Sequence, residues 1–105
     1  SKPSAPSNVK LDWSCSPIPA TLTYAVHVTF SWTDNASNEE GYHIFRNGGL
    51  IATLGANSSS FVDDTTLPVA PAIWPPQPGP KITYGVEAFN GDETSAMKER
   101  ELNCD

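Results

Sequence analysis

Residues 24–32 read YAVHVTFSW, and this stretch decides the fold class. Its apolar side chains fall on one parity, at Val26, Val28, Phe30 and Trp32. The residues between them, His27, Thr29 and Ser31, are polar or small. Successive side chains of a β-strand point to opposite faces, so a period of two predicts a strand with one buried face. We expect Trp32 to belong to the core.

A β-hairpin follows in residues 42–54. Tyr42 and Ile44 alternate with His43, the dipeptide Asn47-Gly48 comes next, and LIATL returns at 50–54. Asn-Gly between two apolar runs is the signature of a tight hairpin turn, because both residues tolerate a positive φ. The sequence therefore predicts two paired strands here.

Weaker alternation predicts the remaining strands. The first has apolar residues at Val9, Leu11 and Trp13, and we expect Trp13 in the core or at its edge. Two prolines in residues 14–23 should end that strand. Further strands are expected at 59–63, at 81–90 and at 93–102. In 81–90 the inward side chains should be Ile82, Tyr84, Val86 and Ala88.

Residues 67–80 hold six prolines around Trp74. Such a segment can form neither a helix nor a central strand, so we expect it to be extended and partly polyproline II. Trp74 could fold back as a plug for one end of the domain or could stay exposed for a partner. The plug is the favoured interpretation.

Seven short strands separated by turns in 105 residues favour an all-β sandwich. No window shows the 3.6-residue apolar period of a helix. Residues 1–7, which are small, polar and proline-containing, resemble a linker from a preceding domain, and residues 8–105 would be one β-sandwich domain.

The charge balance excludes two classes of partner. Lysine and arginine number 6 against 12 aspartate and glutamate, for a net charge of −6. Nucleic acids and anionic membranes require basic surfaces, so neither is expected. No apolar run approaches the ~20 residues of a membrane helix, so we expect no membrane insertion.

Two cysteines, Cys15 and Cys104, bear on the compartment. Neither lies in a CxxC motif, which excludes zinc-ribbon and thioredoxin-like sites. They could be two unrelated buried thiols or one disulfide, and the disulfide is favoured. A disulfide implies an oxidising compartment, hence a secreted, periplasmic or cell-surface protein. Asn-x-Ser sequons at Asn35 and Asn57 matter only in a eukaryotic source.

The chain from residue 6 to about residue 96 resembles a fibronectin type III domain of the kind found in bacterial extracellular proteins. The resemblance lies in SWTDNASNEEGYHIFRNGGLIATL at 31–54 and PGPKITYGVEAFNGDETSA at 78–96. It implies a seven-stranded, immunoglobulin-like sandwich. In that topology the first strand runs toward the pole where the last strand ends, which would bring Cys15 and Cys104 within disulfide reach.

The sequence departs from the family in three places. Ile82 stands where the family has the aromatic residue of its tyrosine corner, and Tyr84 follows two residues later. If Tyr84 is buried, its hydroxyl needs a hydrogen-bond partner. We also expect enlarged connections before the second strand, carrying Cys15, and before the sixth.

Catalytic and metal sites are not favoured. His27 and His43 lie on the outward parity of strands that the resemblance assigns to opposite sheets, so both should be solvated and unable to share a metal. Neither Glu39-Glu40 nor Asp63-Asp64 forms an acid–base pair by adjacency alone. Calcium binding is the weaker interpretation of one loop, because such residues more often cap turns; its oxygen ligands would be Asp34, Asn35, Asn38 and Glu39.

We therefore expect a non-catalytic module that spaces or presents neighbouring domains of an extracellular or cell-surface protein. No cofactor and no metal are expected. The alternative is a carbohydrate- or protein-binding module that uses the proline-rich loop, with Trp74, Pro75 and Pro76 at the contact.

Overall fold

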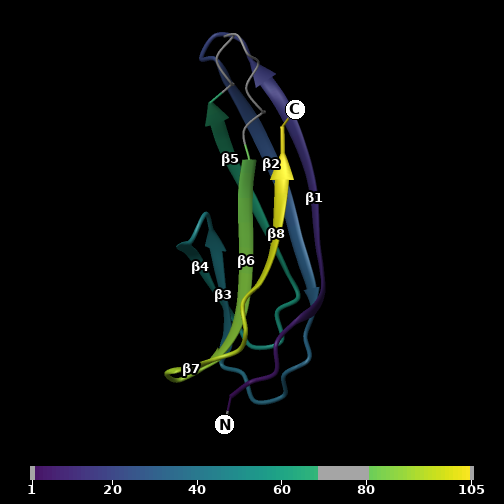
Figure 1. The fold of residues 1–105 in the computed structure, drawn as a ribbon, viewed down its shortest axis with the longest axis vertical. Helices are drawn as coiled ribbons and strands as arrows, with labels where there is room; N and C mark the ends of the chain where they lie inside the picture. Colours follow the sequence, from purple (N-terminus) through teal and green to yellow (C-terminus); the bar gives the residue numbers. More distant parts are fainter. Residues whose placement is uncertain (1, 69–80, 105) are drawn as a thin grey trace.

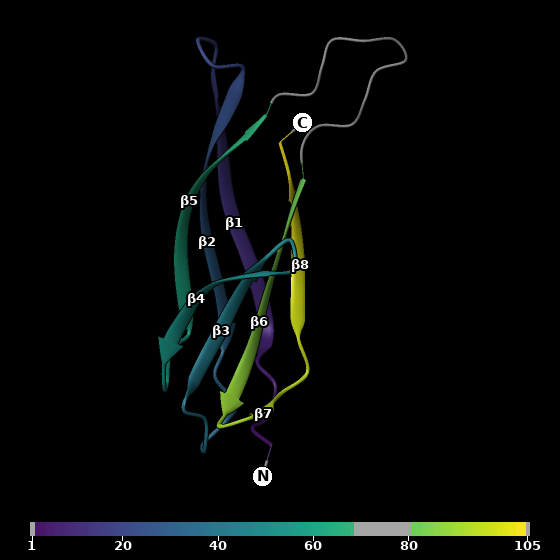
Figure 2. The ribbon, with the colours of Figure 1, turned by 90° about the vertical axis from the view of Figure 1, so that its left-hand side faces the viewer.

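The computed structural model describes residues 2–68 and 81–104. Two antiparallel sheets pack face to face as a β-sandwich, and the described residues contain no helix. The molecule is elongated, with extents of 52 × 23 × 22 Å. Its longer strands run close to the long axis (Figures 1 and 2). The predicted fold class, an all-β sandwich, is confirmed.

The first sheet has three strands in the order β1-β2-β5, which are Ser7–Ile18, Thr23–Thr33 and Ser60–Pro68. The central strand β2 is the one predicted from residues 24–32. Its inward side chains are at most 5% exposed. They are Val26, Val28, Phe30 and Trp32. The parity argument therefore gave the correct register for the strand that anchors the core.

The second sheet contains β3 (Gly41–Arg46), β4 (Gly49–Gly55), β6 (Lys81–Asn90), β7 (Glu93–Thr94) and β8 (Lys98–Asn103). Its order is β4-β3-β6, with β7 and β8 both paired to the far side of β6. The hairpin turn between β3 and β4 has φ values of 51° at Asn47 and 84° at Gly48, as the Asn-Gly dipeptide predicts.

The core lies between the sheets and is rich in aromatic rings. Phe30 packs on Trp32 at a centroid distance of 5.6 Å and on Tyr84 at 5.9 Å, while Trp32 packs on Tyr42 at 5.5 Å. The four inward residues expected in β6 are all buried. They are Ile82, Tyr84, Val86 and Ala88. Both halves of the core thus follow the period-two pattern.

The first strand is longer than predicted. β1 continues through Cys15 and Pro17 to Ile18, and only residues 19–22 connect it to β2. The expectation that residues 14–23 end the strand, and that Cys15 lies in an enlarged connection, was wrong. β1 is the edge of its sheet, and an edge strand tolerates proline because one side of its backbone has no strand to pair with.

The last strand is divided in two, so the described residues form eight strands where seven were predicted. β7 and β8 are separated at residues 95–97. Ser95 explains the interruption: its backbone N–H donates to the carbonyl of Ala88, and its hydroxyl accepts from the N–H of Ala88. A side chain therefore supplies one bond of the ladder, and the strand resumes at Lys98.

The structure describes all of the fifth strand but only part of the proline-rich segment and of residues 1–7. Strand β5 extends to Pro68, five residues beyond the predicted 59–63. The rest of the proline-rich segment, including Trp74, Pro75 and Pro76, lies outside the described residues. Within 1–7, Pro3 and Pro6 are buried, and Asn35 donates to the carbonyl of Ala5. That residues 1–7 form an interdomain linker stays a prediction.

Candidate functional site

The Cys15–Cys104 disulfide joins the two sheets along one side of the sandwich. Cys15 lies in β1 and Cys104 follows β8, and their Cα atoms are 5.8 Å apart. The structure thus contains the disulfide that the sequence favoured. The bond ties the first strand to the end of the last, across 89 residues of sequence.

Trp13 lies on the same seam between β1 and β8. It is directly across from Val28 in the ladder, so it has the core-facing parity that the sequence predicted. Its indole N–H donates to the carbonyl of Asn103 at 3.1 Å. The side chain nevertheless remains 44% exposed because β1 is an edge strand with no neighbour to cover it. Of the two predicted positions, in the core or at its edge, Trp13 therefore occupies the one at the edge.

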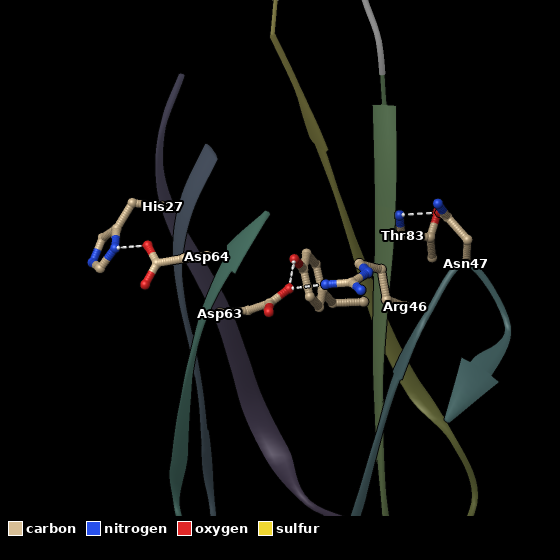
Figure 3. A network of polar contacts seen from close by, with 7 residues as sticks. His27, Arg46, Asn47, Asp63, Asp64 and Thr83 are labelled. Carbon is tan, nitrogen blue, oxygen red and sulfur yellow. Dashed lines mark hydrogen bonds and ion pairs between the residues drawn. The ribbon is translucent and has the colours of Figure 1, made fainter. Parts of the chain in front are cut away.

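A polar contact joins the sheets on the opposite edge of the three-stranded sheet (Figure 3). Asp63 of β5 accepts hydrogen bonds from the hydroxyl of Tyr84 and from Nη1 of Arg46, both at 2.5 Å. The Asp63 side chain is only 14% exposed. Since Tyr84 is fully buried, its hydroxyl needs such an acceptor, as expected from the sequence. We call these three residues the inter-sheet clasp.

Two buried tyrosines have perturbed acidity. Burial, reinforced by the hydrogen bond to Asp63, raises the pKa of Tyr84 above its ordinary value of 10.0. Burial, together with the hydrogen bond to Asp34, raises the pKa of Tyr42 in the same direction. Both hydroxyls therefore remain neutral donors at physiological pH. Their role is structural, because each already donates to a carboxylate of the fold.

The two histidines face opposite sides of the molecule, as predicted. His27 lies on the outer face of the three-stranded sheet, with Nδ1 2.6 Å from Asp64. His43 lies on the outer face of the other sheet, with Nδ1 2.9 Å from Glu87. Its side chain is only 24% exposed, so His43 faces outward as predicted but is less solvated than a surface histidine. Among the residues that the structure describes, no three His, Cys, Asp or Glu side chains form a metal-binding group.

Ser14, His27 and Asp64 form one row across three adjacent strands. Ser14 is paired with His27 in the ladder and His27 with Asp64, which is the order of a nucleophile, base and orienting carboxylate. However, the side chains of His27 and Asp64 are 58% and 76% exposed. Figure 3 shows Asp64 turned toward His27, on the side of β5 away from Asp63. A carboxylate so open to water orients the imidazole weakly.

The residues of the loop considered for calcium form hydrogen bonds that hold the fold. Asp34 accepts from the Tyr42 hydroxyl and from the N–H of Ala36. Asn35 donates to the carbonyl of Ala5 and to the hydroxyl of Ser7. Buried Glu39 accepts from the N–H of Asn57, and Asn90 donates to the carbonyl of Asn38. The bond from Ala36 to Asp34 matches the turn-capping interpretation, whereas the other bonds join the loop to other segments of the chain.

An apolar strip crosses the outer face of the five-stranded sheet, and the sequence reasoning missed it. Four of its members point outward from β3, β4 or β6, and the fifth, Met97, lies over the outward side of Gly85. They are His43, Phe45, Leu50, Phe89 and Met97. Leu50 is 56% exposed and Met97 37% exposed.

Three aromatic rings of the apolar strip are in contact through His43. His43 and Phe89 stack with a centroid distance of 4.1 Å and an angle of 3° between planes. Phe45 meets His43 edge-on at 6.2 Å. Phe45 and Phe89 follow the inward residues Ile44 and Ala88, so an aromatic residue stands where alternation calls for a polar one. That signal in the sequence could have identified the strip.

A shallow hollow of about 410 Å³ lies beside a bulge in β1. Asn8 adopts a φ of 51° at this bulge. The largest residue lining the hollow, Trp32, is only 5% exposed, so its ring is not offered to a ligand. The hollow is lined by Asn8, Val9, Lys10, Ser31, Trp32 and Thr33.

Comparison with known proteins supports the fold. No protein-family model matches the sequence, and no curated protein matches it. The crystal structure of the spore cortex lytic enzyme SleM of Clostridium perfringens contains a similar fold, with a TM-score of 0.66 and 22% sequence identity. The match covers 97% of this chain and 28% of the SleM chain. At this identity the likeness shows a shared fold.

The described residues contain no helix long and apolar enough to cross a membrane.

Proposed function

We propose that this chain is a non-catalytic spacer or presentation module, with a fibronectin type III-like sandwich, in a larger extracellular or cell-surface protein. The observation that carries the proposal is the position of the chain ends. The segment that precedes β1 lies near one end of the long axis, and β8 runs toward the other (Figure 1). A domain that is entered at one end and left near the other holds its neighbours apart.

The strand order supports the fibronectin-like part of the proposal. Immunoglobulin-like sandwiches combine the first, second and fifth strands in one sheet and the third, sixth and seventh in the other. Here β1, β2 and β5 form one sheet, and β3, β6 and the divided last strand belong to the other. β4 pairs with β3 in the second sheet, whereas the fourth strand of a constant-type immunoglobulin domain belongs to the first.

Two further observations support an extracellular module. The disulfide requires an oxidising compartment, which favours a secreted or cell-surface protein. A similar fold makes up 28% of the SleM chain, so a sandwich of this kind can be one part of a longer lytic enzyme. Carbohydrate or protein binding through Trp74, Pro75 and Pro76 remains the alternative proposal.

The spacer role can be tested by placing the chain between two spin-labelled reporter domains and measuring their distance distribution. A glycine–serine linker of 105 residues is the control, with an r.m.s. span of roughly 50–60 Å. That span is close to the 52 Å length of this chain, so the width of the distribution is the informative quantity. We expect a narrow distribution for the sandwich. A distribution as broad as that of the linker would refute the proposal.

A further inference from the structure

The two outer faces of the sandwich differ in chemistry. The outer face of the three-stranded sheet carries short polar side chains in every row, and its large apolar residues are half-buried Ile18 at one end and exposed Val62. These short side chains are Ser14, Ser16, Thr29, Ser31, Ser60 and Thr66. The outer face of the five-stranded sheet carries the apolar strip instead. Both faces belong to one domain with one core, so stability of the sandwich does not explain the difference.

The apolar strip is continuous across neighbouring strands. Phe45 is paired with Leu50 on one side and with Gly85 on the other. Gly85 has no side chain, and Met97 occupies the space above it: a Cβ on Gly85 would lie 2.8 Å from the Met97 sulfur. Leu50, Phe45 and Met97 therefore follow one another across the sheet. Leu50 and Met97 are exposed, and half-buried Phe45 connects them. Contiguous apolar surface of this kind marks interaction surfaces.

Acidic side chains flank the apolar strip. Glu99 is paired with Gly85, Glu101 with Thr83, and Glu87 with His43. Glu99 and Glu101 are exposed, whereas Glu87 is bonded to His43. The cations that alternate with these glutamates along β8, Lys98 and Arg100, have the opposite parity. Lys81 is exposed and also has the outward parity, but it lies one row beyond Thr83 and Glu101, at the end of β6 away from Phe89. The border that Glu99 and Glu101 form along β8 is thus negative.

We propose that the apolar strip is a docking surface for a protein partner that presents apolar side chains flanked by lysine or arginine. Charge complementarity selects this partner, because cations opposite Glu99 and Glu101 favour encounter and suppress wrong partners. A second copy of the chain would bring like charges together, and each copy carries a net charge of −6. The inference goes beyond the spacer role, since a spacer without this surface would still separate its neighbours.

The shapes of the exposed side chains favour protein over carbohydrate. Sugars are held by flat aromatic faces, but His43 and Phe89 cover one face of each other. The most exposed members of the strip are Leu50 and Met97, which are aliphatic and flexible. Flexible aliphatic side chains adapt to the irregular surface of another protein.

The probe for the test is a nine-residue peptide, blocked at both ends, in which leucine and lysine alternate. Two matched peptides carry serine in place of leucine or glutamate in place of lysine. Titration of ¹⁵N-labelled protein gives the Kd and locates the contact by amide shifts. We expect shifts along β3, β4 and β8 with the leucine–lysine peptide. We also expect markedly weaker binding of both matched peptides.

Variants connect the binding to the apolar strip. The double variant Leu50→Ser and Met97→Ser should raise the Kd about tenfold, since exposed apolar anchors dominate such contacts. The control Val62→Ser, an equally exposed apolar residue on the other sheet, should leave the Kd unchanged. Leu50→Ser alone, at a 56% exposed position, tests the proposal without disturbing the packing of Met97 on Gly85.

Three results would overturn the proposal. The first is an equal loss of binding with Val62→Ser, and the second is equal affinity for the serine–lysine peptide. The third is a concentration-dependent dimer, seen by sedimentation, that Leu50→Ser abolishes, which would make a second copy the occupant. Conversion of Glu99 and Glu101 to glutamine should weaken binding and reduce its dependence on salt; unchanged affinity would refute the charge argument.

Discussion

The disulfide should set how far the domain lengthens under tension between its ends. Force applied at the N-terminus passes along β1 to Cys15, crosses to Cys104 and leaves the chain one residue later. Everything between the two cysteines lies inside a covalent loop and carries no load once the strands part. Residues 7–15 already lie in a strand, so they are nearly extended before any unfolding.

The magnitude follows from the loop length. An extended chain spans about 3.3–3.6 Å per residue, so the 89 residue steps between the cysteines correspond to about 300 Å. We expect this gain in contour length when a single reduced molecule unfolds between two handle domains in an atomic force microscope. The oxidised molecule should give no comparable step.

The double variant Cys15→Ser and Cys104→Ser is the control, because it should give the long step under oxidising conditions as well. A step of about 300 Å in the oxidised wild-type protein would refute the reasoning, since the loop would then not be closed. Mass spectrometry of the native protein, finding two free thiols, would refute it independently.

Three further outcomes are expected. Asp63→Ala should lower the free energy of unfolding by about 1–3 kcal/mol in urea titrations, because it leaves the buried Tyr84 hydroxyl without an acceptor. Asp64 is the matched control, because it is paired with exposed His27: Asp64→Ala should change the free energy of unfolding by less than about 0.5 kcal/mol. Equal effects of the two substitutions would contradict the stabilising role of the inter-sheet clasp. Because the pKa of Tyr42 and of Tyr84 is raised, the contribution of these hydroxyls to stability is fully present below pH 10 and is lost as the pH rises above it. The loss in the free energy of unfolding is about 1.4 kcal/mol per pH unit for each tyrosine. Tyr84→Phe should therefore halve the dependence of the free energy of unfolding on pH in alkaline denaturation. Trp74→Ala should cost about 3–5 kcal/mol if the ring plugs the core, and an unchanged melting temperature would favour the binding alternative.

The sequence was most informative where a strand lies in the middle of a sheet. β2 and β6 each have one face in the core, so their apolar residues recur with a period of two and register could be predicted. The outcome differed at β1, an edge strand. There, Pro17 is tolerated inside the strand, and Trp13 keeps the inward parity without being covered.

The candidate sites were harder to predict because they depend on contacts between sheets. Asp63 lies on the same parity as Phe61, which pairs with buried Phe30, so a carboxylate on that parity signals a partner inside the fold. The identity of the partners, Arg46 and Tyr84, depends on which strands of the other sheet face β5. A one-dimensional pattern does not contain that information, whereas an outward aromatic residue such as Phe45 is visible in it.

The disulfide and the inter-sheet clasp explain why the two outer faces of this small sandwich can differ in chemistry. Apolar packing is non-directional, so it holds two sheets together without fixing their relative position along both edges. The Cys15–Cys104 disulfide fixes the β1 edge of the three-stranded sheet, and Asp63 fixes the β5 edge through Arg46 and Tyr84. Because both lateral edges are held by specific bonds, the outward side chains contribute little to the alignment of the sheets. They are free to be polar on one face and, through the apolar strip, suited to a partner on the other.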